Sequence, residues 1–225
     1  MDFSKGETRS GGYDSLSPAK RLAILMVLVS ACLASCSPQS TGQALNPVPL
    51  TPIAAQPIPN TGAAAACSAP ATLTVALTEG PYFKAGSPER ASLVEANTEG
   101  TKLVLSGYVL AADCSPVAHA LLDFWQADAK GQYDNSGYTL RGHQFTDATG
   151  HYQLTTIIPG LYPGRTEHIH VKVQAPAGPV LTTQLFFPGV AQNQSDGIFD
   201  PSLVLPLQSA SDGKTAFFIF VVRSK

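Results

Sequence analysis

Two histidines two positions apart, His168 and His170, are the residues whose type and spacing most directly indicate chemistry in this sequence. Residues 168–173 alternate polar and apolar side chains, the pattern of a β-strand with one buried face. Residues two apart on a strand share a face, with Cα atoms ~6.7 Å apart, so both imidazoles can reach one metal ion. A His-x-His pair alone also suits a solvated polar face, and the rest of the sequence has to separate the two interpretations.

A zinc hydrolase is one class of protein that uses such a pair. Catalytic zinc takes three protein ligands, so a third His, Asp or Glu would have to face the same ion. Glu167 is the nearest carboxylate, but it precedes His168 and therefore points to the opposite face of a regular strand. The sequence disfavours the zinc interpretation.

The elements that position the histidines are predicted to be β-strands joined by turns rich in glycine, proline and aspartate. No segment has a sustained 3.6-residue apolar period, and no internal repeat is found. Several short strands with such turns favour an all-β, antiparallel β-sandwich. The predicted strands are residues 102–110, 120–126, 151–157, 168–173, 180–187 and 216–222.

Five segments, the histidine pair among them, stand in a fixed order along the sequence. Together they resemble the intradiol ring-cleavage dioxygenases, whose motifs cover most of residues 78–189. Each motif alone is weak, but the ordered set is specific. The segments are Thr78-Glu79-Gly80-Pro81-Tyr82-Phe83, residues 123–134, an Arg141-Gly142 turn, residues 157–165 and His168-Ile169-His170.

The resemblance implies a transthyretin-like sandwich and a ferric ion held by two tyrosines and two histidines. The matching positions are Tyr133, Tyr162, His168 and His170, with Tyr162 and His170 axial and the other two equatorial. A phenol of pKa ~10 becomes a phenolate beside a trivalent cation, and such anionic oxygen ligands favour Fe(III). Tyr138 is the rival of Tyr133, and the spacing from Trp125 favours Tyr133.

The same resemblance assigns two catalytic roles besides Tyr162. Arg165 matches an arginine that faces the substrate ring, and Gln184 matches a glutamine near the reacting site. The alternatives are a surface arginine or a partner of Glu167 for Arg165, and a strand-edge hydrogen bond for Gln184. Trp125 is predicted to be a core residue, whereas Lys172 shares the histidines' face at the rim.

The implied activity is cleavage of a catechol-type ring with O₂ to a muconate-type diacid, without an organic cofactor. The alternative is a non-catalytic transthyretin-like module that binds an aromatic ligand or a protein at the cell envelope. A degenerate module is expected to have lost a ligand, and this sequence retains all four. The resemblance leaves an oligomer open.

The N-terminus predicts export. Residues 22–33 are apolar, follow Lys20-Arg21 and are too few to span a bilayer. They end at Leu33-Ala34-Ser35-Cys36, which resembles a bacterial lipoprotein signal in which residues 1–35 are removed and Cys36 is acylated. An ordinary signal peptide with a chance cysteine is the alternative. We expect a lipid-anchored protein of the cell envelope, at the outer membrane or the periplasmic face.

Residues 36–66 are predicted to be a linker, and residues 67–225 the folded domain. From residue 37 onward the linker has six prolines and no charge, so it cannot bury enough apolar surface to fold. Cys67 and Cys114 remain in an oxidising compartment, which favours a disulfide over two free thiols. Residues 36–225 contain ten basic and thirteen acidic side chains without a basic cluster, which argues against nucleic-acid binding.

Overall fold

A computed structural model gives the structure of residues 67–224 of this chain. The predicted signal segment, the lipidation site Cys36 and the linker lie outside the described residues. Within residues 67–224, no helix is long and apolar enough to cross a membrane.

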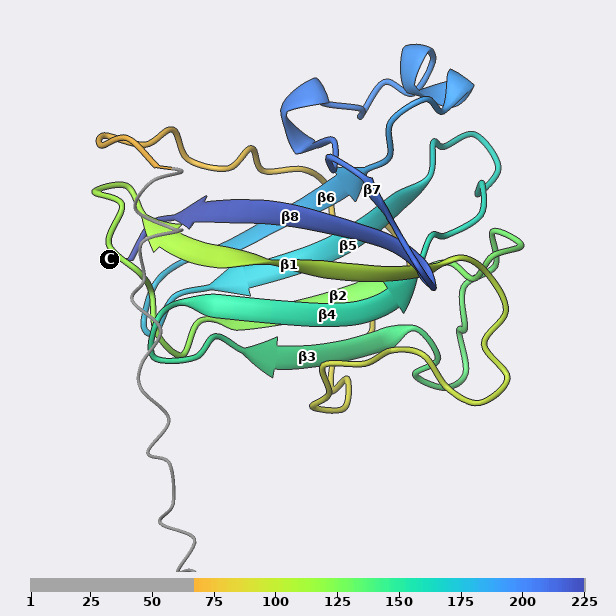
Figure 1. Cartoon of the computed structure of the whole chain (residues 1–225), viewed down its shortest axis with the longest axis horizontal. Coiled ribbons are helices and arrows are strands. Elements are labelled where there is room, and N and C mark those ends of the chain that lie inside the picture. Colours follow the sequence, from red (N-terminus) through yellow and green to blue (C-terminus); the bar gives the residue numbers. More distant parts are fainter. Residues whose placement is uncertain (1–66, 225) are drawn as a thin grey trace, which may run out of the picture. The chain divides into compact units, whose positions relative to one another are not determined.

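The described residues form strands connected by loops, with two short 3₁₀ turns and no α-helix (Figure 1). The β-sandwich predicted from the sequence is therefore confirmed. The elements are β1 (Lys102–Ala111), β2 (Leu121–Gln126), β3 (Arg141–Phe145), β4 (His151–Ile157), β5 (His168–Gln174), β6 (Val180–Phe186), η1 (Ala191–Gln194), η2 (Pro201–Leu203), β7 (Gln208–Ala210) and β8 (Gly213–Val222).

The strands form two four-stranded sheets, in the orders β4-β1-β8-β7 and β3-β2-β5-β6. In Figure 1 the first sheet lies in front of the second. Neighbouring strands run antiparallel, as predicted, except that β1 and β8 are parallel. The parallel pair arises because β8, the last strand of the chain, lies beside β1, the first, at the centre of the first sheet.

The core fills the space between the two sheets with alternate residues of the central strands. Ile169, Val171 and Val173 of β5 are fully buried there, as the alternation of residues 168–173 predicted. The opposite sheet contributes Leu103, Leu105 and Leu154, among others. Burying a large aliphatic side chain stabilises the fold by about 2 kcal/mol. The histidines of β5 consequently belong to the face that points away from this core.

Two strands were not predicted, and one prediction was wrong. Arg141-Gly142, expected to be a turn, begins β3 and pairs with Trp125 and Phe124. Gly142 fits this strand because a Cβ there would lie 2.7 Å from the Arg90 side chain. The sequence of β3 lacks an apolar alternation, and β7 is only three residues long, so neither produced a pattern.

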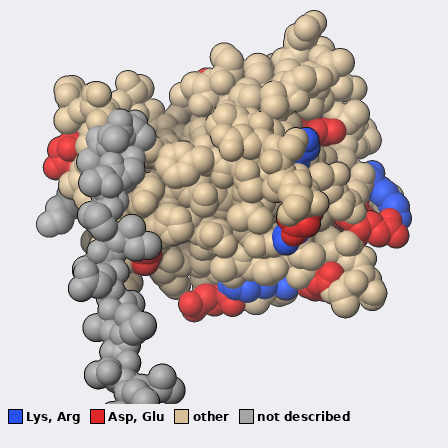
Figure 2. Space-filling view, viewed as in Figure 1, with Lys and Arg blue, Asp and Glu red and all other residues tan. Residues whose placement is uncertain are grey.

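The outer face of the first sheet has few charged side chains, among them Lys102 of β1, which pairs with Asp212. Along β1 the outward residues Val104, Ser106 and Tyr108 alternate with buried leucines and valines. Figure 2 shows few charged side chains over this view, and most of those that it shows lie along its lower and right edges. The titratable side chains of β1 and β4 on this face, Lys102, Tyr108 and His151, are all partly exposed, in contrast to the buried polar side chains on the outer face of the other sheet.

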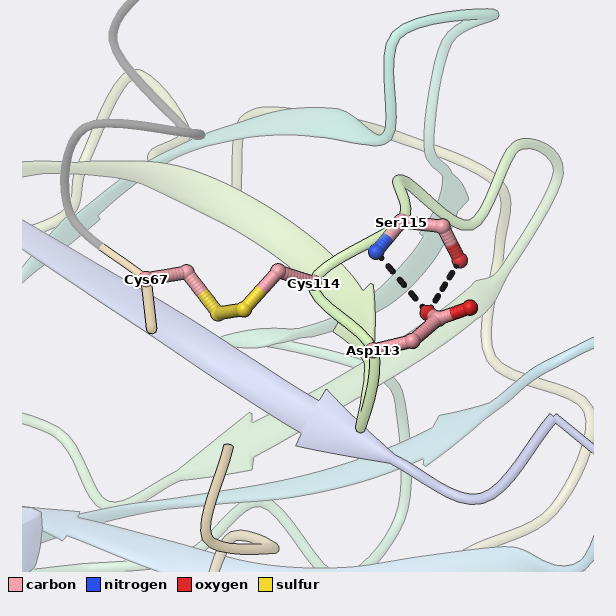
Figure 3. The surroundings of a disulfide bond; sticks show 4 residues. All are labelled: Cys67, Asp113, Cys114 and Ser115. Atoms are coloured by element: carbon pink, nitrogen blue, oxygen red, sulfur yellow. Dashed lines mark hydrogen bonds between the residues drawn. A yellow bond between two sulfur atoms is a disulfide. The ribbon is translucent and has the colours of Figure 1, made fainter. Parts of the chain in front are cut away.

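Cys67 and Cys114 form a disulfide, with Cα atoms 5.9 Å apart (Figure 3). Cys114 occupies a turn after β1 in which the Asp113 carboxylate accepts hydrogen bonds from the backbone N–H and the hydroxyl of Ser115. The chain then runs from Cys67 past β8 and β6, where Thr74 N donates to Val221 O and Leu77 N to Thr182 O. The disulfide thus fixes the start of a segment that leads directly to the site.

Candidate metal centre

The outer face of the second sheet has a row of four buried polar or aromatic side chains, one from each strand. Cross-strand pairing places Arg141 of β3 beside Trp125 of β2, Trp125 beside His170 of β5, and His170 beside Gln184 of β6. Each is at most 2% exposed. A second layer must cover this face, because polar side chains on an outer sheet face are otherwise solvated.

Residues 77–90, called here the cover segment, form that layer. Thr78 O accepts a hydrogen bond of 2.8 Å from Gln184 Nε2, and Tyr82 O accepts one of 2.6 Å from Arg141 Nη1. Between them Gly80 has a φ of +71°, and a Cβ there would lie 3.3 Å from His170 Cε1. Only glycine adopts this backbone freely at so close an approach. The cover segment thus closes over the histidine row.

His168 and His170 direct their Nε2 atoms toward each other, 3.0 Å apart. The Nδ1 of His168 lies 2.6 Å from Thr166 O, and because a carbonyl only accepts, that nitrogen bears the hydrogen. The Nε2 of neutral His168 therefore presents a lone pair. His170 stacks on Trp125 with ring centroids 4.8 Å apart. The 3.0 Å spacing suits two nitrogens bound at ~2.1 Å to one ion at about a right angle.

Tyr133 brings an oxygen to the same point. Its hydroxyl lies 3.2 Å from His168 Nε2, whereas Tyr138 donates to Ala85 O elsewhere. Tyr133 follows a tight turn in which the Asp128 carboxylate accepts hydrogen bonds from the backbone N–H groups of Lys130 and Gln132. The structure therefore places Tyr133, and not its rival, beside the histidines.

Tyr162 lies against Tyr133, with ring centroids 5.9 Å apart. Two glycines allow their loops to meet. A Cβ on Gly131 would lie 2.0 Å from Leu161 O, and a Cβ on Gly160 would lie 2.4 Å from Ala129 O. The backbone of one tyrosine loop therefore packs directly on the backbone of the other, and this contact sets the separation of the two rings.

The Tyr162 hydroxyl bonds to Tyr82 of the cover segment, at 2.7 Å. Tyr82 also stacks on Tyr133, with centroids 4.4 Å apart and planes 13° from parallel. This hydrogen bond is the largest of the effects that raise the pKa of Tyr82. Tyr82 was not predicted to be a site residue, although it lies inside the Thr78–Phe83 motif, which was the signal in the sequence that could have indicated it.

Burial controls the protonation of these groups. It lowers the pKa of His168 to about 4 and the pKa of His170 well below its ordinary value, so both imidazoles are neutral at pH 7. Burial also raises the pKa of Tyr133, against the lowering effect of Arg165 and Arg141. Without a cation the Tyr133 phenol stays protonated. A bound trivalent ion would reverse this preference, since metal ions stabilise the deprotonated forms of their ligands.

The donor set fits a hard trivalent ion held by two nitrogens and two phenolate oxygens. Within residues 67–224, no three His, Cys, Asp or Glu side chains gather as a metal site, so the described residues supply no third zinc ligand. The donors instead come from the regular strand β5 and from the two tyrosine loops. The residues that would hold the ion are Tyr133, Tyr162, His168 and His170.

Arg165 lies next to this set but pairs differently from the alternative suggested by the sequence. Its partner is Asp196, with Nε 2.8 Å from the Asp196 carboxylate, and not Glu167. Its Nη2 donates to Gln184 Oε1 at 2.6 Å. Gln184 therefore links Arg165 to the cover segment, where its amide donates to Thr78 O. Asp196 belongs to no motif used in the sequence analysis.

The other residues of the face have structural contacts. Lys172, predicted at the rim, pairs with Glu79 of the cover segment at 2.5 Å and lies 3.5 Å above the Phe83 ring. Trp125 is 1% exposed and contacts Phe83, so its assignment to a packing role agrees with the structure. His143 bonds to Ser87.

Comparisons with known proteins agree with this geometry. The family model described as Dioxygenase matches residues 78–218, more than half of the chain. Catechol 1,2-dioxygenase 2 of Acinetobacter lwoffii is 33% identical over 137 residues, covering 49% of this chain and 50% of that protein. Chlorocatechol 1,2-dioxygenase of Pseudomonas sp. (strain P51) is 28% identical over 64% of this chain and 68% of its own.

Among solved structures, one is the dioxygenase domain of a dioxygenase carbohydrate-binding protein fusion from Streptomyces sp. SirexAA-E. It is 54% identical, with a TM-score of 0.67, and the alignment covers 68% of this chain and all of that domain. The 3-chlorocatechol 1,2-dioxygenase of Rhodococcus opacus 1CP aligns with a TM-score of 0.63 at 28% identity, covering 67% of this chain and 72% of its own. The chain described here therefore belongs to the intradiol ring-cleavage dioxygenase family.

Proposed function

We propose that this protein is a non-haem Fe(III)-dependent intradiol dioxygenase that cleaves a catechol-type ring with O₂ to a muconate-type diacid. The observation that carries the proposal is the convergence of Tyr133 Oη, His168 Nε2 and His170 Nε2, with neighbouring atoms 3.0–3.2 Å apart. Bound Fe(III) would supply a Lewis acid that draws electron density from a catecholate and so activates its ring toward O₂.

The residues of the chain have separable tasks in this proposal. His168 and His170 offer neutral nitrogens because burial keeps them unprotonated. Tyr133 offers a buried oxygen. Tyr162 lies on a loop and hydrogen-bonds to Tyr82. In this proposal its phenolate oxygen accepts a proton from a catechol hydroxyl, and the resulting hydroxyl hydrogen-bonds to Tyr82.

Arg165 supplies the positive charge of the site. Its side chain is 17% exposed, and its guanidinium is fixed between Asp196 and Gln184. A cation held rigidly beside a substrate stabilises negative charge that develops on the ring oxygens, since its orientation costs nothing during the reaction. The cover segment contributes by burying the row of residues beneath it, which limits access of water and strengthens this electrostatic effect.

The names of the relatives support the proposed substrate class. Those matched include proteins named as catechol, chlorocatechol and hydroxyquinol 1,2-dioxygenases. All are named for vicinal ring diols, so we propose a catechol-type diol, with dioxygen as the second substrate.

We also propose that the chain is exported and anchored to the cell envelope by a lipid on Cys36. The Cys67–Cys114 disulfide supports an oxidising location, because such bonds persist outside the cytosol. Labelling cells with a palmitate analogue tests this proposal. We expect the parent protein to take up the label and the Cys36→Ala variant not to. A parent protein that stays unlabelled and is found in the soluble fraction would contradict the proposal.

The function is tested by the visible spectrum and iron content of the purified protein, before and after adding catechol under nitrogen. A broad red-brown tyrosinate band at about one iron per chain is expected, since each site has one set of four donors. The band should shift with catechol, and O₂ should then yield a diacid product. A protein that stays colourless after reconstitution with iron would refute the proposal and leave a non-catalytic binding module.

A further inference from the structure

Asp196 is a buried carboxylate in the loop after η1, and one of its two oxygens bonds to residues next to the site. Its side chain is 2% exposed. One oxygen, Oδ2, accepts hydrogen bonds from Arg165 Nε at 2.8 Å and from the backbone N–H of Thr166 at 2.9 Å. The other oxygen, Oδ1, accepts from Ile198 N at 2.9 Å within its own loop. A single carboxylate thus joins two adjacent residues of another segment.

Asp196 thereby joins Arg165 and Thr166, and Thr166 in turn contacts the histidine strand β5. Thr166 O is the acceptor for His168 Nδ1. The Thr166 hydroxyl bonds to Asn193 of η1, and Asn193 Nδ2 donates to Phe187 O at 2.8 Å. The loop after β6 therefore holds residues 165 and 166 through one charged and one neutral side chain.

The bond to Asp196 also determines how the guanidinium is used. Asp196 takes Nε and Gln184 takes Nη2, so neither of these two side chains uses Nη1. Two partners on different nitrogens fix the plane of the guanidinium, which is rigid and presents its donors in a fixed fork. Although burial opposes ionisation, hydrogen bonds from Thr166, Ile198 and Arg165 hold the pKa of Asp196 below its ordinary value.

We infer that Asp196 is a positioning residue of the site, which holds the Arg165 guanidinium in the orientation that acts on a bound ring diol. This inference rests on the proposed function. Outer partners that orient a metal site typically contribute tenfold to a hundredfold to activity. Asp196→Asn keeps the size of the side chain and one oxygen acceptor but removes the charge that binds Arg165.

The experiment compares Asp196→Asn, Arg165→Gln and the double variant in the full chain, with Asp200→Asn as the matched control. Asp200 caps η2 in the same loop region, where its carboxylate accepts hydrogen bonds from the backbone N–H and the hydroxyl of Ser202. We expect Asp196→Asn to lower kcat/KM for catechol roughly tenfold to a hundredfold with the iron content unchanged. The melting temperature should also fall, because the amide has one oxygen fewer to accept from Arg165, Thr166 and Ile198. Asp200→Asn should stay within about twofold of the parent protein, as for surface substitutions.

The double variant separates positioning from a general structural effect. If Asp196 acts through Arg165, then Asp196→Asn should change kcat/KM less than about threefold once Arg165 is already Gln, because coupled residues are not additive. A full loss in that background, or no loss in the single variant, would overturn the inference. Failure of the parent protein itself to cleave any catechol would instead refute the proposed function.

A readout that needs no iron completes the test. In the metal-free protein, the Arg165 Nε–H should give a protected NMR signal that is lost in Asp196→Asn and kept in Asp200→Asn. The signal of the parent protein tests the contact even if Asp196→Asn does not fold. An Arg165 Nε–H that exchanges freely with solvent in the parent protein would show that Asp196 does not hold it.

Discussion

The two halves of the candidate metal centre are built in different ways. His168 and His170 stand on the regular strand β5, are at most 4% exposed and are supported from both neighbouring strands. Tyr133 and Tyr162 stand on loops, are half-buried and are placed by contacts between loops and with the cover segment. The histidine half is thus a property of the sheet, and the tyrosine half depends on how separate segments meet.

This difference suggests a division of labour. Ligands on a packed strand move little, because the neighbouring side chains hold each of them in one rotamer. Ligands on loops can move without disturbing the core, since loops open at lower free-energy cost. Tyr162 is the candidate ligand on a loop whose hydroxyl already has a second phenol, Tyr82, as its hydrogen-bond partner.

Removing a strand ligand should have the largest effect. His170→Ala removes a nitrogen donor that no described side chain can replace, so iron content should fall well below one per chain. We expect activity to fall at least about a thousandfold, the equivalent of ~4 kcal/mol of metal-assisted catalysis. Iron analysis, the visible spectrum and turnover measure this. His151→Ala, on the outer face of β4, is the control and should retain both iron and colour; full activity in His170→Ala would contradict the assignment.

Acid should destabilise the histidine half of the metal-free protein. Burial lowers the folded-state pKa of His168 to about 4, below the unfolded value of ~6.5. The unfolded chain therefore binds a proton in this window that the folded chain does not, and stability falls as pH drops from ~6.5 to ~4. The loss from His168 is about 3 kcal/mol.

Urea unfolding at a series of pH values measures this slope, with His168→Gln as the matched variant. The variant has no imidazole to protonate at this position and should show a shallower dependence on pH. Equal slopes in the two proteins would mean that His168 titrates normally in the folded state.

The contrast between the two halves also explains what the sequence could and could not predict. The alternation around His168 and His170 predicted their strand, its buried face and their common side, because a strand's side-chain period depends only on local sequence. The alternation could not show that a second layer covers the polar face. That layer depends on hydrogen bonds across more than fifty residues, such as Tyr82 O with Arg141.

The tyrosine half was assigned by resemblance and not by periodicity. Tyr133 and Tyr162 lie in segments without a strand or helix pattern. Gly131 and Gly160 are needed because the backbones of the two loops contact each other, and only the structure shows that contact. Asp196 lay outside every motif. Its role depends on a loop that folds back from the end of β6, which no local pattern specifies.

A single methyl group should separate the tyrosine loops. In Gly160→Ala the new Cβ would lie 2.4 Å from Ala129 O, so one loop must shift. We expect a destabilisation of about 1–3 kcal/mol, as for other overpacked sites, together with a weakened tyrosinate band. Thermal unfolding and the visible spectrum measure the two effects. Gly197→Ala is the control, because no atom lies within 4 Å of a Cβ at that position; an equal response of the two variants would show that the loop contact is not tight.

The smallest expected effect comes from one oxygen atom. Tyr82→Phe keeps the ring that stacks on Tyr133 but removes the hydroxyl bonded to Tyr162. A hydrogen bond of this kind contributes about 1 kcal/mol, so kcat should fall roughly fivefold with iron content unchanged. Tyr138→Phe removes a hydroxyl of the same type, which donates to Ala85 O of the cover segment and to none of the four candidate ligands, and it should leave kcat unaltered. If both variants lose activity equally, the hydrogen bond between Tyr82 and Tyr162 has no specific effect on kcat. The difference between the strand ligands and the loop ligands would then have to come from the loop backbone alone.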